Sequence, residues 1–109
     1  NMLGQLAEDF AHNAGIDCSE IIWTEDDSNT RNGLYFIERG FGIRPPNSVF
    51  DRTNTAVSKL KTGDIDWQKI LSKARWFHTG GVFAGLSDTT PEVVSEAMQI
   101  AGKEGAIVS

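Results

Sequence analysis

The sequence predicts an α/β fold in which a β-hairpin interrupts an alternation of helices and strands. Residues 3–14 and 90–101 carry apolar side chains at the spacing of one helical face. Residues 33–38 and 48–52 are rich in aromatic and β-branched side chains, and glycines and prolines separate the two segments. Residues 106–108 form an apolar run typical of a buried parallel strand. Helices, a hairpin and a parallel strand together indicate the α/β class.

The first helix is expected to begin almost at the first residue, with Asn1 as its cap, and to end at Gly15. Residues 21–24 are predicted to form a short strand, and residues 25–29 a polar turn. The apolar face of the helix consists of Leu3, Leu6, Ala7, Phe10, Ala11 and Ala14.

A hairpin is predicted over residues 33–53, with a long loop at 39–46. Asp64 is then expected to cap a short helix. The apolar positions of that helix are Ile65, Trp67, Ile70 and Leu71.

Residues 74–109 are expected to form a right-handed βαβ unit. Its first strand lies at 75–78, and a loop at 82–89 follows. The long helix starts with a hydroxyl cap at Thr90 and proline at the next position, Pro91, before an acidic residue in the first turn.

The amino-acid composition excludes several classes of protein and partner. The 109 residues are 39% hydrophobic and 23% charged, with a net charge of −5, which is ordinary for a globular domain with one modest core. This excludes intrinsic disorder and a disulfide scaffold, and the acidic balance without a basic cluster argues against nucleic acid as a partner. The single cysteine, Cys18, favours a reducing compartment. No apolar run reaches the roughly 20 residues of a membrane helix, and no signal peptide is present, so we expect no membrane partner and a cytoplasmic location.

Both ends of the sequence suggest a fragment. The chain begins with Asn1, inside a helical pattern, and it stops at Ser109, inside a predicted parallel strand. A parallel strand needs neighbours and a crossover connection. We therefore expect a partial domain that is truncated at both ends.

The first candidate site follows the strand at 75–78. In open α/β sheets, ligands lie beyond the carboxyl ends of the strands, which places Thr79, the pair Gly80-Gly81 and Val82 beside such a site. The glycines would let a ligand approach the backbone. The alternative is that the glycine pair is simply a tight turn, which is a common role for this dipeptide.

The hairpin carries a sharper pattern. Residues two apart in a strand share a face, so Phe50 and Arg52 point the same way, and Tyr35 on the partner strand can join them. A guanidinium beside an aromatic ring suits a small ligand with a carboxylate, because arginine binds carboxylates bidentately. The alternative, which the pattern alone favours, is a solvated arginine beside two packing aromatics.

Other candidates are weaker. His78 is expected to be a core or strand-end histidine, because His12 is far away in the sequence and no cluster has metal-ligand spacing. Cys18 has no histidine at a motif spacing, which argues against a thiol nucleophile. The acidic run 25–27 is interpreted as a solvated turn. No phosphate-binding loop of the Walker type occurs.

Several short motifs, in this order and spacing, resemble the ribokinase/PfkB family of sugar kinases, and most of all its 2-keto-3-deoxygluconate kinases. The resemblance covers nearly the whole chain. It rests on Gly15-Ile16-Asp17, Gly33-Leu34-Tyr35-Phe36, Phe50-Asp51-Arg52, Asp66-Trp67, Phe77-His78-Thr79-Gly80-Gly81 and Leu86-Ser87.

The resemblance implies part of a ribokinase-like α/β sandwich, with the hairpin as an inserted lid over the sugar site. It implies transfer of the γ-phosphoryl group of ATP to a sugar hydroxyl with Mg²⁺, and a possible homodimer formed through the lid. By resemblance, Tyr35 and Arg52 contact a sugar acid, with Arg52 facing the carboxylate, and Val82 lines the sugar pocket. Phe50 stands where such kinases often carry a tyrosine, which leaves the exact substrate open.

Two family motifs are absent from this sequence. One is the N-terminal glycine and asparagine motif for the sugar, and the other is the C-terminal Asp-Thr-x-Gly-Ala-Gly-Asp motif, which holds the catalytic base. We therefore expect no catalytic residue in this stretch, most ATP contacts outside it, and no kinase activity from it alone. The alternatives are a fructokinase or ribokinase acting on a neutral sugar, and a non-catalytic α/β binding module.

Overall fold

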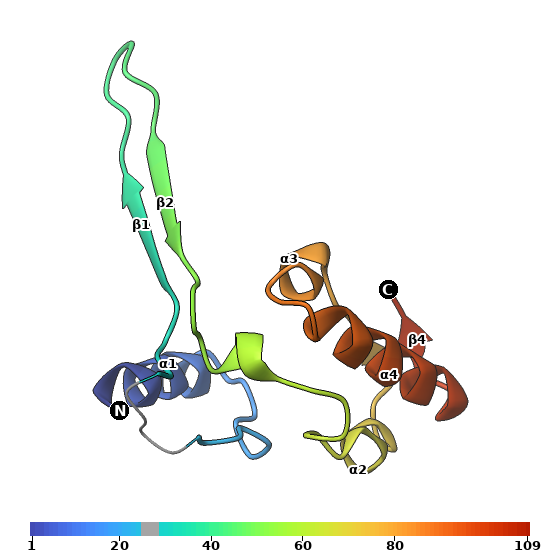
Figure 1. The fold of residues 1–109 in the computed structure, drawn as a ribbon. Coiled ribbons are helices and arrows are strands. Elements are labelled where there is room, and N and C mark those ends of the chain that lie inside the picture. Colours follow the sequence, from blue (N-terminus) through green and yellow to red (C-terminus); the bar gives the residue numbers. More distant parts are fainter. Residues whose placement is uncertain (25–28) are drawn as a thin grey trace. The chain divides into compact units, whose positions relative to one another are not determined.

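The computed structural model describes residues 1–24 and 29–109, so most of the turn predicted at 25–29 lies outside the described residues. The chain mixes helices and strands and divides into two compact units, Asn1–Ala56 and Val57–Ser109. Figure 1 shows the elements of both units in sequence colours. Within the described residues, no helix combines the length and the apolar character that crossing a membrane requires.

The first unit begins with α1 (Met2–Asn13), which starts and ends as predicted. The Asn1 side chain accepts a hydrogen bond from the Gly4 N–H at 3.1 Å, and Gly15 takes the left-handed conformation (φ 81°) that ends the helix. The predicted apolar face is present, but no residue of α1 is buried within the described chain. No described element packs closely enough on this face to cover it.

The strand predicted at 21–24 is wrong. These residues adopt no regular secondary structure, because no described segment pairs with them. Trp23 packs on α1 instead, and a β-carbon at Gly4 would lie only 3.0 Å from the indole ring. Of the apolar residues that suggested a strand, Trp23 contacts the helix, while Ile21 and Ile22 stay exposed.

The hairpin consists of β1 (Leu34–Glu38) and β2 (Asn47–Asp51), paired antiparallel from Leu34 opposite Asp51 to Glu38 opposite Asn47 (Figure 1). Each strand lies within one residue of its predicted position. At the tip, Phe41 and Arg44 exchange two backbone hydrogen bonds of 3.1 Å, which closes a tight turn. Gly42 in this turn has a φ of 60°, a conformation that glycine adopts without strain.

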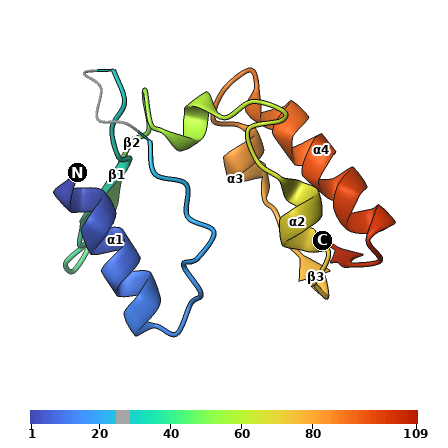
Figure 2. The same ribbon diagram turned by 90° about the horizontal axis from the view of Figure 1, so that it is seen from below.

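The second unit holds the remaining elements, with α4 (Thr90–Lys103) at its centre. Helix α4 contacts α2 (Trp67–Leu71) and α3 (Gly81–Ala84), which lie beside it in Figure 2, and it also contacts β4 (Ile107–Val108). β4 pairs in parallel with β3 (Trp76–Phe77). A short 3₁₀ turn, Val57–Lys59, precedes these elements.

The core of this unit is small. Leu71, Ala101 and Ala106 are buried together, and Trp67 meets Phe77 edge-on with ring centroids 5.9 Å apart. Small residues on α4 allow α2 and β4 to approach it closely. Burial of these side chains is the main favourable term that holds the unit together.

The N-terminal cap of α2 differs from the prediction, which named Asp64. Helix α2 is capped by Asp66, whose carboxylate accepts a hydrogen bond from the Lys69 N–H at 3.0 Å. Asp64 lies too far from the first turn and instead accepts from the Lys61 N–H at 2.8 Å. A capping side chain must directly precede the first helical residue to reach the free N–H groups.

The loop predicted at 82–89 is also partly wrong, because Gly81–Ala84 form the single-turn helix α3. A single turn is too short to produce a helical hydrophobic period. The hydroxyl of Thr90 does not cap α4 from outside: Thr90 is the first helical residue. This hydroxyl lies 3.1 Å from the Ala84 and Ser87 carbonyls and accepts a hydrogen bond from the Ser87 N–H, which links α4 to the turn after α3.

Replacement of Thr90 by valine tests this link. The side chain is fully buried, and Thr90→Val keeps its shape but leaves the N–H of Ser87 and the carbonyls unpaired. We expect the free energy of unfolding to fall by about 1–3 kcal/mol, measured by urea denaturation of the full-length protein. Thr62→Val, at an exposed position, is the control and should change it by less than about 0.5 kcal/mol. Equal midpoints for the two variants would contradict this account of Thr90.

Candidate substrate-binding site

One face of the hairpin gathers the residues that could bind a ligand. Tyr35 on β1 lies directly opposite Phe50 on β2. Because residues two apart share a face, Ser48 and Arg52 lie on the same side as Phe50. The antiparallel register therefore brings together three of the predicted site residues: Tyr35, Phe50 and Arg52.

The two aromatic rings form the floor of this site. Tyr35 and Phe50 stack with ring centroids 4.5 Å apart and an angle of 17° between their planes. The Tyr35 hydroxyl is 3.1 Å from the Ser48 hydroxyl, so the phenol end of the stack is held by a hydrogen bond. Both rings remain about half exposed, which leaves aromatic surface for a ligand.

Arg52 lies over the Phe50 ring. Its guanidinium carbon is 4.3 Å from the ring centroid, which is the distance of a cation–π contact. Arg52 is exposed and forms no ion pair with any described residue. The stacked ring orients the guanidinium, and its N–H donors stay available to a carboxylate.

An ion pair fixes the base of the hairpin on the opposite face. Arg31 binds Asp51 bidentately: one guanidinium nitrogen is 3.0 Å from Oδ2, and the other contacts Oδ1. Local sequence patterns did not predict this pair, because the two residues are 20 positions apart. The available signal was the hairpin itself, since the expected pairing brings the residues before its first strand close to the end of its second.

Val82 belongs to the second unit. It lies in α3, directly after Gly80 and Gly81, with 65% of its surface exposed. The backbone carbonyl of Gly80 accepts hydrogen bonds from the N–H groups of Phe83 and Ala84, so the glycine pair opens a helical turn.

His78 lies at the end of β3, in agreement with the expectation of a core or strand-end histidine. Its Nδ1 is 2.9 Å from the Ser109 hydroxyl, which also accepts a hydrogen bond from the Trp76 indole N–H at 2.8 Å. These contacts tie the ends of the two parallel strands together and give His78 a structural role.

The loop after α1 contains a local turn and a contact back to the helix, from the Cys18 thiol to the Glu8 carbonyl at 4.0 Å. The Ser19 backbone N–H donates to the Asp17 carboxylate at 2.9 Å, and the hydrogen bonds from Ser19 hold the pKa of Asp17 below its ordinary value. The Cys18 thiol is 3.5 Å from the Ile16 carbonyl, to which it donates.

Among the described residues, no three His, Cys, Asp or Glu side chains gather into a group that could hold a metal ion. The acidic run 25–27, interpreted as a solvated turn, lies outside the described residues.

Comparison with known proteins gives the class. No family model matches the chain. A 2-dehydro-3-deoxygalactonokinase of Haloferax volcanii is 34% identical over 79 residues, which cover 72% of this chain and 24% of that protein. The crystal structure of a 2-dehydro-3-deoxygluconokinase from Thermotoga maritima covers 99% of this chain, with a TM-score of 0.90 and 35% identity. A PfkB family carbohydrate kinase from Listeria grayi also covers 99%, with a TM-score of 0.87 and 25% identity.

These likenesses define an α/β chain with the fold of PfkB family carbohydrate kinases, and they confirm the resemblance stated from the sequence. Within that class, the chain is similar to kinases named for 2-dehydro-3-deoxy (that is, 2-keto-3-deoxy) sugar acids. The chain spans 24% of the length of the Haloferax protein and 32% of each crystallised kinase.

A double-mutant cycle tests the stacked floor of the site. We expect Tyr35→Ala and Phe50→Ala to be coupled by about 1 kcal/mol in the free energy of unfolding, because stacked rings add to simple burial. The control cycle pairs Tyr35→Ala with Val49→Ala, which lies on the other face and should couple by less than about 0.5 kcal/mol. Denaturant titration of the full-length variants gives both values. Equal coupling in the two cycles would contradict the stack.

Proposed function

We propose that this chain is the lid-bearing part of a longer carbohydrate kinase. The enzyme transfers the γ-phosphoryl group of ATP to a hydroxyl of a 2-keto-3-deoxy sugar acid, with 2-keto-3-deoxygluconate as the first candidate. The observation that carries this proposal is the Arg52 guanidinium, which lies over the Phe50 ring and forms no ion pair within the described chain. A cation held in this way next to exposed aromatic surface suits an anionic sugar better than a neutral one.

Each residue of the hairpin face has a distinct part in the proposal. Arg52 binds the sugar carboxylate through two parallel hydrogen bonds, which fix the orientation of the substrate. The stacked Tyr35 and Phe50 rings cover an apolar face of the sugar chain. For Val82, which is exposed in α3, apolar contact with the sugar is proposed from the family resemblance alone.

Phe50 also bears on the choice of sugar. Where a tyrosine would offer a hydroxyl, Phe50 offers only a ring, so Tyr35 and its partner Ser48 supply the hydroxyl groups of this face. The galactonate and gluconate substrates that the relatives' names indicate differ in the configuration of one carbon. Arg52 fixes the carboxylate that both share, and discrimination between them depends on hydroxyl contacts.

ATP and Mg²⁺ are the co-substrate and metal that the kinase class implies. By the family resemblance, both are proposed to bind mostly through residues outside this stretch. Phosphoryl transfer depends on positioning and charge stabilisation, and the hairpin supplies the positioning of the sugar. An ATP-consuming sugar kinase is proposed to act in the cytoplasm, where ATP is produced and consumed.

Replacement of Arg52 by alanine in the full-length enzyme tests the substrate class. Loss of a bidentate, charge-assisted contact should lower kcat/KM for 2-keto-3-deoxygluconate about 100-fold, mainly through KM, while KM for ATP stays unchanged. A coupled assay of ADP release gives these constants. Arg39→Ala, another exposed arginine of the hairpin segment, is the control and should have little effect. An enzyme that prefers fructose or ribose, and that Arg52→Ala leaves unaffected, would support the neutral-sugar alternative instead.

We also propose a homodimer formed through the hairpin. The tip exposes two large apolar side chains, Phe41 and Ile43, with 90% and 105% of their reference areas accessible. A second copy of the hairpin would remove this surface from water. The double variant Phe41→Ser with Ile43→Ser should convert the dimer into a monomer in sedimentation equilibrium, whereas Ile16→Ser, an exposed residue outside the hairpin, should not. A full-length protein that is monomeric before substitution would contradict the proposal.

A further inference from the structure

We infer that Arg31 and Asp51 are positioning residues for Arg52: their ion pair holds in place the segment that carries this guanidinium and keeps the Asp51 carboxylate from competing with the sugar carboxylate for it. This inference rests on the proposed function, in which Arg52 binds that carboxylate. It concerns two residues on the face of the hairpin opposite the site. They act through the segment that carries Arg52 and do not touch the substrate.

Arg52 needs such support, because it stands beyond the end of its strand. β2 ends at Asp51, and the last pair of the hairpin joins Leu34 to Asp51. No pair of the β1–β2 ladder includes Arg52. Its position therefore depends on how firmly the residues on either side of it are held.

Arg31 holds both sides of this segment. Its side chain binds the Asp51 carboxylate bidentately, and its backbone forms a parallel bridge to Thr55. In this bridge the Arg31 N–H donates to the Asn54 carbonyl at 3.2 Å, and the Ala56 N–H donates to the Arg31 carbonyl at 3.2 Å. One residue thus clamps the chain immediately before Arg52 and again two to four residues after it.

The clamp is tightly packed. Thr55 is buried, with 3% of its surface exposed, and Asn54 takes a left-handed conformation (φ 56°) between the two attachment points. A β-carbon at Gly33 would come within 3.3 Å of the Thr55 methyl group and 3.7 Å of the Asp51 carbonyl. The segment therefore has little room to shift while the ion pair is intact.

The Arg31–Asp51 pair also neutralises the negative charge of Asp51, the residue next to Arg52. Asp51 directly precedes Arg52, and its carboxylate is an internal competitor for the guanidinium. Strand alternation turns Asp51 to the opposite face, and Arg31 engages both of its oxygens. Arg52 consequently keeps its donors for the substrate. The partial exposure of Arg31 and Asp51 weakens the pair as a source of stability, so its main effect is expected on binding.

The test combines Asp51→Asn with Arg52→Ala in the full-length enzyme. Asp51→Asn alone should raise KM for 2-keto-3-deoxygluconate about tenfold, with kcat and KM for ATP changed less than about twofold, because a small displacement of a binding group weakens substrate positioning. In the Arg52→Ala background, Asp51→Asn should raise KM no further, because the residue through which it acts is gone. A purely structural role would give the same fold-change in both backgrounds.

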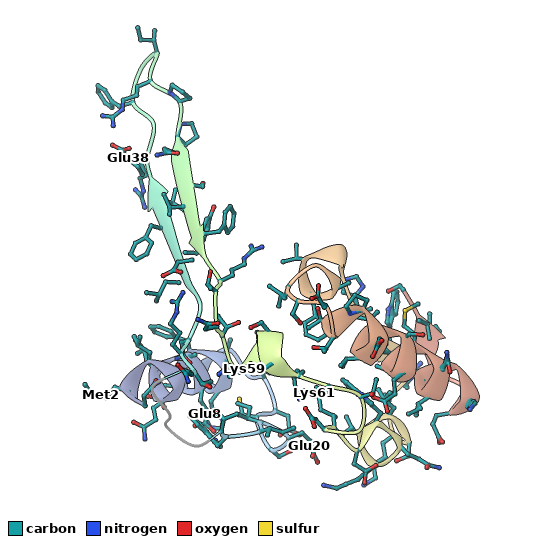
Figure 3. The ribbon with its side chains drawn as sticks, in the orientation of Figure 1. Met2, Glu8, Glu20, Glu38, Lys59 and Lys61 are labelled. Atoms are coloured by element: carbon teal, nitrogen blue, oxygen red, sulfur yellow. The ribbon has the colours of Figure 1, made fainter. Side chains whose placement is uncertain are left out.

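Glu38→Gln is the matched control. Glu38 forms the other ion pair of the hairpin, with Arg44, and lies farther along it (Figure 3). Its loss should leave KM for the sugar acid unchanged. If the Asp51→Asn variant fails to fold, Arg31→Lys replaces it, because lysine keeps the positive charge but cannot bind Asp51 bidentately. Arg31→Lys should raise KM for the sugar acid about threefold when Arg52 is present and should not change KM in the Arg52→Ala variant.

Two results would overturn the inference, and they are distinguishable. If Arg52→Ala raises KM for the sugar acid but Asp51→Asn multiplies it further by an equal factor in both backgrounds, the positioning role is wrong and the proposed function stands. If Arg52→Ala itself leaves KM unchanged, the proposed function fails and the positioning role fails with it.

Discussion

The pairing of Tyr35 opposite Phe50 is the constraint on which the rest of the site depends. It stacks the two rings and places Arg52 over one of them. A shift of one residue in the register would turn Phe50 and Arg52 to the other face and bring Asp51 to the site. An acidic residue would then stand where the proposal needs a cation. The substrate class that the hairpin can bind therefore follows from its register.

The same period-two logic explains why much of the site could be predicted from the sequence. Alternation placed Phe50 and Arg52 on one face, and helical spacing located α1 and α4. The two errors in secondary structure share a cause, because both concern short segments whose conformation depends on their neighbours. Residues 21–24 were predicted as a strand, but Trp23 packs on Gly4. Helix α3 was not predicted, and it is a single turn after Gly80. Local patterns do not contain that information.

The ion pair at the base of the hairpin was missed for a different reason. Arg31 and Asp51 are 20 positions apart, and each alone resembles a solvated surface charge. The pair becomes visible only when the register and the bridge from Arg31 to Thr55 are known. The strand-end rule placed Val82 beside a candidate site, but its role in a sugar pocket and the departure at Phe50 came from the family resemblance. Strand alternation thus identified Arg52 as a candidate binding residue, and the family resemblance indicated a sugar acid as its ligand.

The most direct test of this account is a crystal structure of the full-length enzyme with 2-keto-3-deoxygluconate. The account predicts the sugar carboxylate within hydrogen-bond distance of two Arg52 nitrogens, with an apolar face of the sugar against the Tyr35 and Phe50 rings and Arg31 still bound to Asp51. A carboxylate held by another residue, with Arg52 turned to solvent, would contradict the central claim that this hairpin recognises an acidic sugar.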